Sequence, residues 1–240
     1  MTEIKFKRVL IKLSGEALAG EAGFGVDPVA CEKIAAQLTP AAQLGVGIGI
    51  VIGAGNLMRG RHLADATNIH RTTGDYMGML GTVMNGLALR DALQSQGTDA
   101  VVVSAIAMPL LCEQYFRPRV LEHLQAGRVV IFVGGTSHPG VTTDMCAAIR
   151  ASEIEADALL KATKVDGVYT ADPHKDPTAT RYETLTYEKA VVDRLGVMDL
   201  AAMAFCMDHN VPIMVFKMDE PGNLVRAVEG QTIGTLVQAN

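Results

Sequence analysis

The chain consists of short, continuous apolar runs separated by longer stretches in which apolar and polar residues alternate. A continuous apolar run is typical of a strand that is covered on both faces. Seven runs are therefore expected to be strands, at residues 8–13, 47–53, 100–105, 128–135, 158–163, 211–216 and 232–237. Strands of this kind predict a mainly parallel sheet in the interior of the protein.

The stretches between these runs predict helices. Apolar residues recur at helical spacing in residues 27–44, 74–97, 142–156 and 198–210. Asp27 followed by Pro28 is a typical helix start, and Asn210 before Pro212 a typical end. The alternation of strands and helices predicts an α/β fold, a three-layer α/β/α sandwich with a mainly parallel central sheet. Residues 165–182 lack a helical pattern and are expected to form a functional loop or a hairpin.

Composition narrows the class of protein. The 240 residues are 49% hydrophobic and 20% charged, which suits one large domain over residues 1–240. A net charge of −5 argues against a nucleic-acid-binding scaffold. The longest apolar runs are too short to cross a membrane, and the N-terminus is too charged for a signal peptide. Four separated cysteines fit buried thiols in a reducing compartment, so we expect a cytoplasmic protein.

The turn Gly53-Ala54-Gly55 directly follows a predicted strand. A dinucleotide-binding turn requires the pattern G-x-G-x-x-G, but here the sixth position is Met58 and the next glycine is Gly60. This turn alone is explained equally well by phosphate binding and by a purely structural role.

Four predicted strands end in glycine, hydroxyl or positively charged residues. These ends are residues 12–15, 53–56 with Arg59 nearby, 134–136 and 161–164. Carboxyl ends of parallel strands meet at one edge of a sheet, where ligands bind, so the pattern favours a polyanion site. Neither the P-loop motif nor the protein-kinase motifs occur.

Phosphoryl transfer depends on cations and backbone N–H groups around the transferring group. Lys12 and Arg59 supply charge, and Gly15 allows a close backbone approach. Asp144 and Asp199 are candidates to fix the lysine or to meet Mg²⁺ through water. Each has a simpler interpretation, because Lys12 also fits an ordinary lysine at a strand end and Asp144 a helix N-cap.

Six motifs resemble one family in the same order along the chain. They are KLSGEAL, GNLMRG, GDYMGMLGTVMNGLALRDAL, TTD, EIEADALLKATKVDGVYTADPHKDPTA and VMDLAA. From residue 7 to residue 237 the chain resembles the bacterial uridylate kinases (UMP kinases) of the amino acid kinase superfamily. The first two motifs also occur, loosely, in acetylglutamate, aspartate and carbamate kinases. The third motif and the run LLKATKVDGVYTADP are specific to the UMP kinases.

The resemblance implies the reaction ATP + UMP → ADP + UDP with Mg²⁺ accompanying ATP, and no resident metal site. It implies catalytic roles for Lys12, Arg59, Asp144 and Asp199, with Asp199 orienting Lys12. ATP would contact Lys12, Leu13, Ser14, Gly15, Gly55, Arg59, Thr163, Lys164, Tyr169 and Asp172. UMP would contact Ala54, Asp75, Thr136, Ser137, His138, Pro139, Gly140, Val141, Thr142 and Thr143. The first part of the chain would hold UMP and the phosphates, and residues from about 155 to 240 the ATP nucleoside.

One position departs from the family pattern. The family commonly has three glycines where this chain has Gly53-Ala54-Gly55. A methyl group at Ala54 could crowd the phosphate of UMP.

The segment GEAGFG, residues 20–25, looks from sequence alone like a surface turn. The resemblance instead implies activation by GTP, inhibition by UTP and a homohexamer built as a trimer of dimers. The GTP site would be shared between subunits at the centre of the hexamer. Its contacts would be Gly20, Glu21, Ala22, Gly23, Phe24, Gly25 and Arg128, with Arg90 as a further basic candidate. Met77, Met79 and Met84 are expected in the core or at a subunit interface.

Two other functions fit the same residues. One is a kinase of the superfamily that acts on a carboxylate or carbamate. The other is a regulatory protein that senses nucleotides without catalysis.

Overall fold

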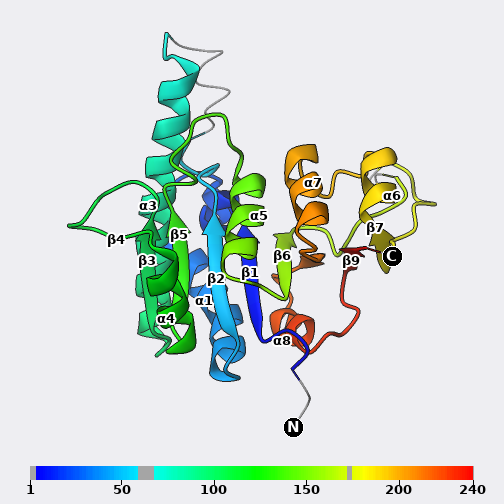
Figure 1. Cartoon of the computed structure of the whole chain (residues 1–240), viewed down its shortest axis with the longest axis horizontal. Coiled ribbons are helices and arrows are strands. Elements are labelled where there is room, and N and C mark those ends of the chain that lie inside the picture. The colour runs from blue at the N-terminus through cyan, green and yellow to red at the C-terminus, as the bar shows by residue number, and fades with distance from the viewer. Residues whose placement is uncertain (1–3, 59–67, 172–174, 240) are drawn as a thin grey trace.

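Apolar runs of the chain form the strands of a nine-stranded sheet (Figure 1). The computed structural model describes residues 4–58, 68–171 and 175–239. Six strands coincide with predicted runs: β1 (Arg8–Leu13), β2 (Gly47–Ile52), β3 (Ala100–Ser104), β5 (Val129–Val133), β6 (Ala158–Thr163) and β8 (Ile213–Lys217). β9 (Thr235–Gln238) occupies only the last part of its predicted run, and β4 (Glu113–Gln114) and β7 (Thr184–Thr186) are not predicted by the pattern.

The sheet is mainly parallel, as predicted. Its strand order is β4-β3-β5-β2-β1-β6-β8-β9-β7, and β8 and β9 pair antiparallel while the other named pairs are parallel. β1 lies between β2 and β6, so the segments that follow these three strands emerge side by side at one edge.

Helices cover both faces of the sheet. One face packs against α1 (Pro28–Gln43), α3 (Arg71–Ser95) and α8 (Asn223–Val228). The other packs against α4 (Arg117–Gln125), α5 (Thr143–Glu153), α6 (Tyr187–Val192) and α7 (Leu200–Asp208). Two short 3-10 helices, η1 (Gly15–Leu18) and η2 (Gly20–Ala22), follow β1. The predicted three-layer α/β/α arrangement is confirmed (Figure 1).

Successive side chains of β1 point to opposite faces of the sheet and so pack against different helix layers. Val9, Ile11 and Leu13 belong to the core under α1 and α3, whereas Leu10 belongs to the core under α5. Because successive side chains of a strand point to opposite faces, Lys12 lies on the same face as Leu10. The strand therefore delivers one lysine to the α5 side at its carboxyl end.

The predicted helix boundaries follow from local signals. The Asp27 side chain accepts a hydrogen bond from Val29 N at 2.9 Å, with Pro28 at the first helical position of α1. The chain leaves α7 through Asn210, which adopts a left-handed conformation with φ 52°. The predicted start at Asp27 is confirmed, whereas α7 ends at Asp208, shortly before the predicted Asn210.

Within the described residues of this segment, 165–171 and 175–182, the chain pairs with itself as in a hairpin, one of the two predicted alternatives. Thr170 N donates to Thr180 O at 3.0 Å and Tyr182 N donates to Val168 O at 2.8 Å. Tyr169 and Arg181 form an antiparallel bridge between these bonds.

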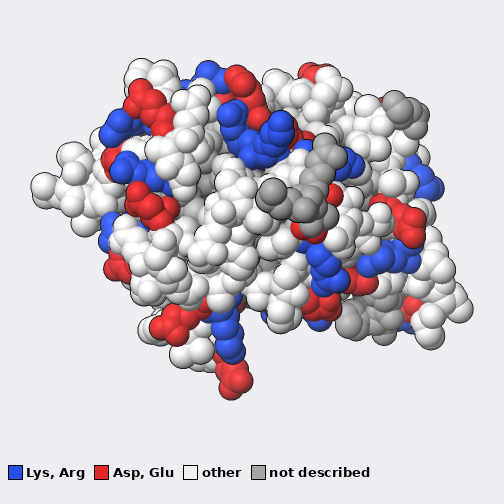
Figure 2. Space-filling model, turned by 90° about the horizontal axis from the view of Figure 1, so that it is seen from below, with Lys and Arg blue, Asp and Glu red and all other residues white. Residues whose placement is uncertain are grey.

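Charged side chains of both signs are interspersed on the face of the molecule seen from below in Figure 2. Among the described residues on that face, acidic side chains interrupt the basic ones, which does not favour a nucleic-acid surface there. Within the part of the chain that the structure describes, every helix is too short or too polar to span a membrane.

Candidate active site

Two lysines lie side by side at the carboxyl ends of neighbouring strands. Lys12 on β1 and Lys161 on β6 are partners in the strand register, so both side chains point toward α5. Asp144, in the first turn of α5, contacts both. Its Oδ1 lies 2.9 Å from Lys12 Nζ and its Oδ2 lies 3.2 Å from Lys161 Nζ. One carboxylate thus balances one of two adjacent positive charges, and the cluster retains the other.

Burial and charge together set the protonation of this cluster. The side chains of Lys12, Asp144 and Lys161 are only 15–16% exposed. Burial by itself would raise the pKa of Asp144, but the two ammonium groups outweigh it and the pKa lies below 3.8. Burial lowers the pKa of Lys161 below 10.5, with Asp144 opposing the shift and Lys12 adding to it. Asp144 is therefore ionised at neutral pH, which suits an anchor for the lysines rather than a proton acceptor.

The N-termini of α5 and α7 are joined beside this cluster. Thr142 caps α5 by accepting from Met145 N at 3.0 Å, and its hydroxyl donates to Asp199 Oδ2. The other oxygen of Asp199 accepts from Ala202 N at 2.9 Å and so caps α7. A hydroxyl–carboxylate hydrogen bond therefore joins the two helix starts, in addition to the apolar packing of α5 against α7.

The two carboxylates have different contacts in the structure. The N-cap of α5 is Thr142 and not Asp144, which leaves the Asp144 carboxylate available to the lysines. The carboxylate that contacts Lys12 is Asp144, whereas the contacts of Asp199 run to Thr142 and to its own helix. The charge of Asp199 still acts on the cluster, since it opposes the lowering of the Lys161 pKa.

A cavity of about 370 Å³ opens beside the cluster, a volume within the usual range for small-molecule sites. It is lined by α3, by the turn after β2 and by the segment that leads into α5. Six of the residues expected to contact UMP line it, namely Ala54, Asp75, Thr136, Val141, Thr142 and Thr143. Gly55, expected to contact ATP, lines it as well.

The four other residues expected to contact UMP, Ser137 to Gly140, lie in the loop above this cavity rather than in its lining. Gly140 N donates to Asp75 Oδ2 at 2.8 Å, which ties the loop to α3. The loop bends sharply, since Ser137 and Gly140 both have positive φ, 65° and 80°. His138 turns back onto the loop itself, with Nδ1 2.8 Å from Thr136 O.

We call residues 53–56 the phosphate turn, and it packs tightly against the chain after β1. A Cβ atom on Gly15 would lie 2.5 Å from Asn56 Oδ1 and 2.6 Å from Gly53 O, so only glycine fits there. A Cβ on Gly55 would come no closer than 3.6 Å to Glu16. Packing therefore explains Gly15 by itself, whereas a Cβ at Gly55 would make only ordinary contact with Glu16, so packing does not require glycine there.

Two further residues expected to contact ATP serve the local fold. Leu13 is 1% exposed within the core, so only its backbone is available to a ligand, and its carbonyl accepts from Gly53 N at 3.0 Å. A side-chain contact from Leu13 to ATP is excluded by this burial. Ser14 caps η1 by accepting from Glu16 N at 3.4 Å.

The methyl group of Ala54 packs against α3. A Cβ added to Gly81 would lie 2.9 Å from the Ala54 Cβ. The extra methyl in the phosphate turn is therefore accommodated by a helix position that has no side chain. Since Ala54 is only 8% exposed, its methyl takes up little of the cavity surface.

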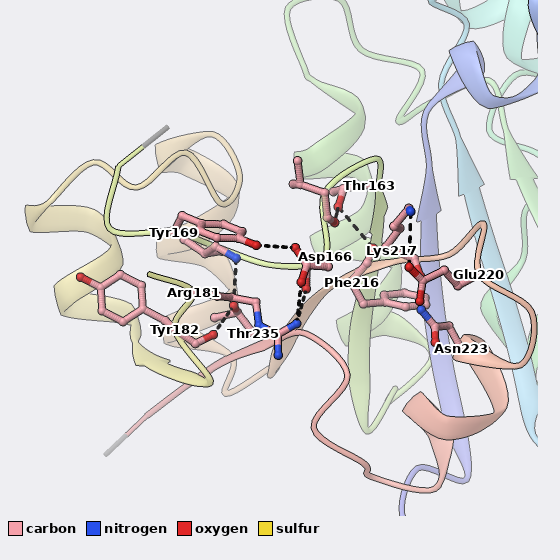
Figure 3. A network of polar contacts seen from close by, with 12 residues as sticks. Thr163, Asp166, Tyr169, Arg181, Tyr182, Phe216, Lys217, Glu220, Asn223 and Thr235 are labelled. Carbon is pink, nitrogen blue, oxygen red and sulfur yellow. Dashed lines mark hydrogen bonds and ion pairs between the residues drawn. The ribbon is translucent and has the colours of Figure 1, made fainter. Parts of the chain in front are cut away.

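Thr163, the last residue of β6, and Tyr169 are two further residues expected to contact ATP (Figure 3). The Thr163 hydroxyl lies 2.5 Å from Val165 O and 3.2 Å from Phe216 O. Tyr169 donates to Asp166 at 2.7 Å, and the same carboxylate pairs with Arg181 at 2.8 Å. These contacts fix the base of the hairpin next to the lysine cluster.

Lys164 is exposed at the start of this segment. Arg59 and Asp172, also expected in the site, lie outside the described residues.

Residues 20–25, here called the glycine segment, do not meet Arg128 within one chain. The glycine segment follows the carboxyl end of β1, and Gly25 N donates to Asn56 O at 3.0 Å. Arg128 precedes the amino end of β5, where it pairs with Asp99 at 2.8 Å. The two lie at opposite ends of parallel strands, so a site that uses both would have to be shared between subunits, as expected for the GTP site.

Several lining residues were not singled out from the sequence. Met79 is one of them, predicted for the core or an interface. Lys161 belongs to the lysine cluster and not to the lining, and the sequence marks it only as part of a strand end. The other unassigned lining residues are Val51, Ile52, Met58, Gly74, Gly78, Thr82, Phe132, Gly135 and Cys146. Lys161 had a usable signal, because it lies on the predicted strand at 158–163, as Lys12 does on the first.

Within the described residues, no group of three or more His, Cys, Asp or Glu side chains is arranged to hold a metal ion. The two carboxylates proposed to meet Mg²⁺, Asp144 and Asp199, are both engaged by protein donors. Because these carboxylates already have protein partners, they are better suited to a metal ion that enters together with a bound ligand than to a resident ion.

Comparison with known proteins agrees with this geometry. The sequence pattern of the amino acid kinase family matches residues 7–217, and the chain belongs to this family. The uridylate kinase of Saccharophagus degradans is 53% identical, over 98% of this chain and 94% of that protein. The uridylate kinase of Pseudomonas aeruginosa is 51% identical, over 98% and 95%.

Solved structures give the same result. A UMP kinase from Bacillus anthracis superimposes with a TM-score of 0.94 at 42% identity, covering 98% of this chain and 97% of that one. A UMP kinase from Ureaplasma parvum gives 0.90 at 35% identity, covering 97% and 98%. The resemblance drawn from the six motifs is thereby confirmed, as is the assignment to the kinases.

Proposed function

We propose that the chain transfers the γ-phosphoryl group of ATP to UMP and so forms ADP and UDP. The observation that carries this proposal is the Lys12–Asp144–Lys161 cluster beside a cavity of about 370 Å³. The similarity to proteins named uridylate kinase over nearly the whole chain supports the choice of UMP as acceptor.

Lys12 and Lys161 would act on the charge of the transferring group. Two ammonium groups with one balancing carboxylate leave a net positive charge at the sheet edge. Such fixed charges stabilise a transition state without having to reorganise during the reaction. Asp144 keeps both lysines in place, and Val197 O holds Lys161 further at 2.5 Å.

The reaction needs no general base. The attacking atom is a phosphate oxygen of UMP, which is already anionic at neutral pH. The lowered pKa of Asp144 agrees with this, because a carboxylate ionised so readily is a weak proton acceptor.

ATP and UMP would meet between the ends of β1, β2 and β6. The ATP phosphates would lie over Ser14, Gly15 and Gly55, with Arg59 as an additional cation. The nucleoside of ATP would lie against residues from about 155 to 240, near Thr163, Lys164, Tyr169 and Asp172. UMP would occupy the cavity lined by Ala54 and Thr143. Asp75 would accept a hydrogen bond from a ribose hydroxyl of UMP. The loop of residues 136–143 would contact the polar edge of the uracil base and so distinguish it from other bases.

Mg²⁺ would accompany ATP. It prefers oxygen ligands, retains several waters and is usually held by one or two carboxylates together with substrate phosphates. Asp144 and Asp199 provide oxygens of this kind, reached directly or through water. When bound, the ion neutralises charge on the phosphates.

The family resemblance supports three further properties. They are a cytoplasmic location, a homohexamer built as a trimer of dimers, and regulation by GTP as activator and UTP as inhibitor. UTP would occupy the UMP cavity. The GTP site would have to combine the glycine segment and Arg128 from different chains, because one chain keeps them apart. A GTP titration at fixed ATP and UMP tests this regulation, and a flat response would remove it.

The experiment for the main proposal is an ADP-release assay with ATP and Mg²⁺ and one acceptor at a time. We expect turnover with UMP and none with N-acetylglutamate, aspartate or carbamate. Turnover with a carboxylate or carbamate alone would favour the other kinases of the superfamily. Nucleotide binding without any turnover would favour a sensor protein.

A further inference from the structure

We propose that Asn56 and Asn85 are positioning residues that couple the phosphate turn to the glycine segment. The inference rests on the proposed function, since it concerns the turn over which the phosphoryl group would pass. Asn56 is the last residue of the phosphate turn and Asn85 lies in the middle of α3. Both side chains are completely buried.

The two side-chain amides form a closed pair. Asn56 Nδ2 donates to Asn85 Oδ1 at 2.9 Å, and Asn85 Nδ2 donates to Asn56 Oδ1 at 2.8 Å. Each amide nitrogen has a second hydrogen. That of Asn85 is donated to Gly53 O at 2.8 Å, and that of Asn56 to Gly25 O at 2.6 Å.

All four N–H donors of the pair are therefore satisfied. The two bonds that leave the pair, which we call the outer bonds, run to different loops, namely the glycine segment at Gly25 and the phosphate turn at Gly53. A buried polar group costs free energy unless it is hydrogen-bonded, so breaking either outer bond penalises the whole pair. The phosphate turn and the glycine segment thus share one network. The backbone bond from Gly25 N to Asn56 O adds a second connection between the same two residues.

The glycine segment is suited to move this network. Gly20, Gly23 and Gly25 all have positive φ, and Phe24 is 71% exposed at the tip. A displacement of Gly25 would pull on Asn56, and through Asn85 on the carbonyl of Gly53. The position of the phosphate turn would then depend on whatever contacts Phe24.

A matched pair of glycine substitutions tests this coupling. Gly25 and Gly45 have φ of 83° and 82°, and no described atom lies within 4 Å of an added Cβ at either position. Gly25→Ala and Gly45→Ala therefore impose the same backbone strain, but only Gly25 is bonded to Asn56. Thermal unfolding of both variants checks that their global stability falls equally.

Hydrogen–deuterium exchange measures the coupling independently of catalysis. The amides to follow are those of Gly53, Leu57 and Met58, each of which is hydrogen-bonded in the structure. We expect Gly25→Ala to raise their exchange, and the KM for UMP, by at least about fivefold relative to Gly45→Ala. Equal effects of the two substitutions would overturn the proposal.

A double-mutant cycle locates the coupling in the amide pair. Asn85→Asp keeps an acceptor for Asn56 but cannot donate to Gly53 O. In the Asn85→Asp protein we expect Gly25→Ala to raise amide exchange in the phosphate turn, and the KM for UMP, by less than about twofold. If Gly25→Ala has the same effect with and without Asn85→Asp, the proposal is overturned. If Asn85→Asp does not fold, the two glycine variants decide alone. A wild type that is inactive with UMP would refute the proposed function, while the exchange contrast would still test the coupling.

Discussion

Lys12 and Lys161 occupy paired positions on adjacent parallel strands, and their ammonium groups reach the two oxygens of a single carboxylate. Like charges at paired positions of a sheet repel each other, so the arrangement needs Asp144 in order to persist. At this edge of the sheet, a bound polyphosphate would supply the negative charge that the cluster lacks.

Lys12→Ala is expected to remove most of the turnover while UMP binding survives. One charge contact to a transition state is worth roughly 10²–10³ in kcat. Steady-state kinetics and calorimetric titration of UMP separate the two effects. A variant that keeps more than about a tenth of the wild-type kcat would show that Lys12 is not the stabilising cation.

Lys161 gives the rate a distinctive pH dependence. Its pKa is lowered, so the side chain loses its charge as pH rises through a value below 10.5. We expect the wild-type kcat to fall on this alkaline side. Lys161→Arg keeps its charge in that range, so its decline should begin at higher pH. Identical alkaline limbs in the two proteins would assign the decline to another group.

Asp144→Asn is expected to cost about 3–5 kcal/mol of unfolding free energy at pH 7, because it leaves two buried ammonium groups without their partner. The folded-state pKa of Asp144 is lowered, so its stabilisation is present above 3.8 and is lost as pH falls through the lower folded value. Denaturant unfolding from pH 7 to pH 3 should show the difference from wild type shrinking.

The matched control for this variant is Asp99→Asn, which breaks the exposed pair with Arg128. It should cost at most about 1 kcal/mol at either pH. Equal losses in the two variants would show that the buried cluster is no more important than a surface pair.

The contact between Ala54 and Gly81 predicts compensation. Gly81→Ala places a methyl 2.9 Å from the Ala54 Cβ and should destabilise the protein by about 1–3 kcal/mol. Adding Ala54→Gly removes the clash, so the double variant should regain the wild-type melting temperature and UMP KM. Additive losses would mean that the two residues do not restrict each other.

Most of the fold could be predicted because its signals are local. Continuous apolar runs identify the six central strands, and Asp27 with Pro28 identifies the start of α1. β4 and β7 were missed because strands of two and three residues carry no recognisable pattern. Their pairing depends on neighbours that are distant in sequence.

The site was predictable only in part for the same reason. A strand end marks Lys12, but the contact of Asp144 with two lysines depends on the register of β1 with β6 and on the position of α5. The sequence likewise cannot reveal that the carboxylate of Asp199 is engaged by Thr142. The Asn56–Asn85 pair shows no motif of its own, because the two residues lie on separate elements.

The central claim is that UMP is the acceptor. Its most direct test is the ratio of kcat/KM values for UMP, CMP and AMP in one coupled ADP-release assay. Uracil and cytosine differ by a carbonyl and an amino group, and a buried mismatch of this kind costs about 1–3 kcal/mol, so UMP should be preferred by roughly 5- to 150-fold. Comparable values for UMP and CMP would contradict the uridylate assignment and leave a general pyrimidine nucleotide kinase.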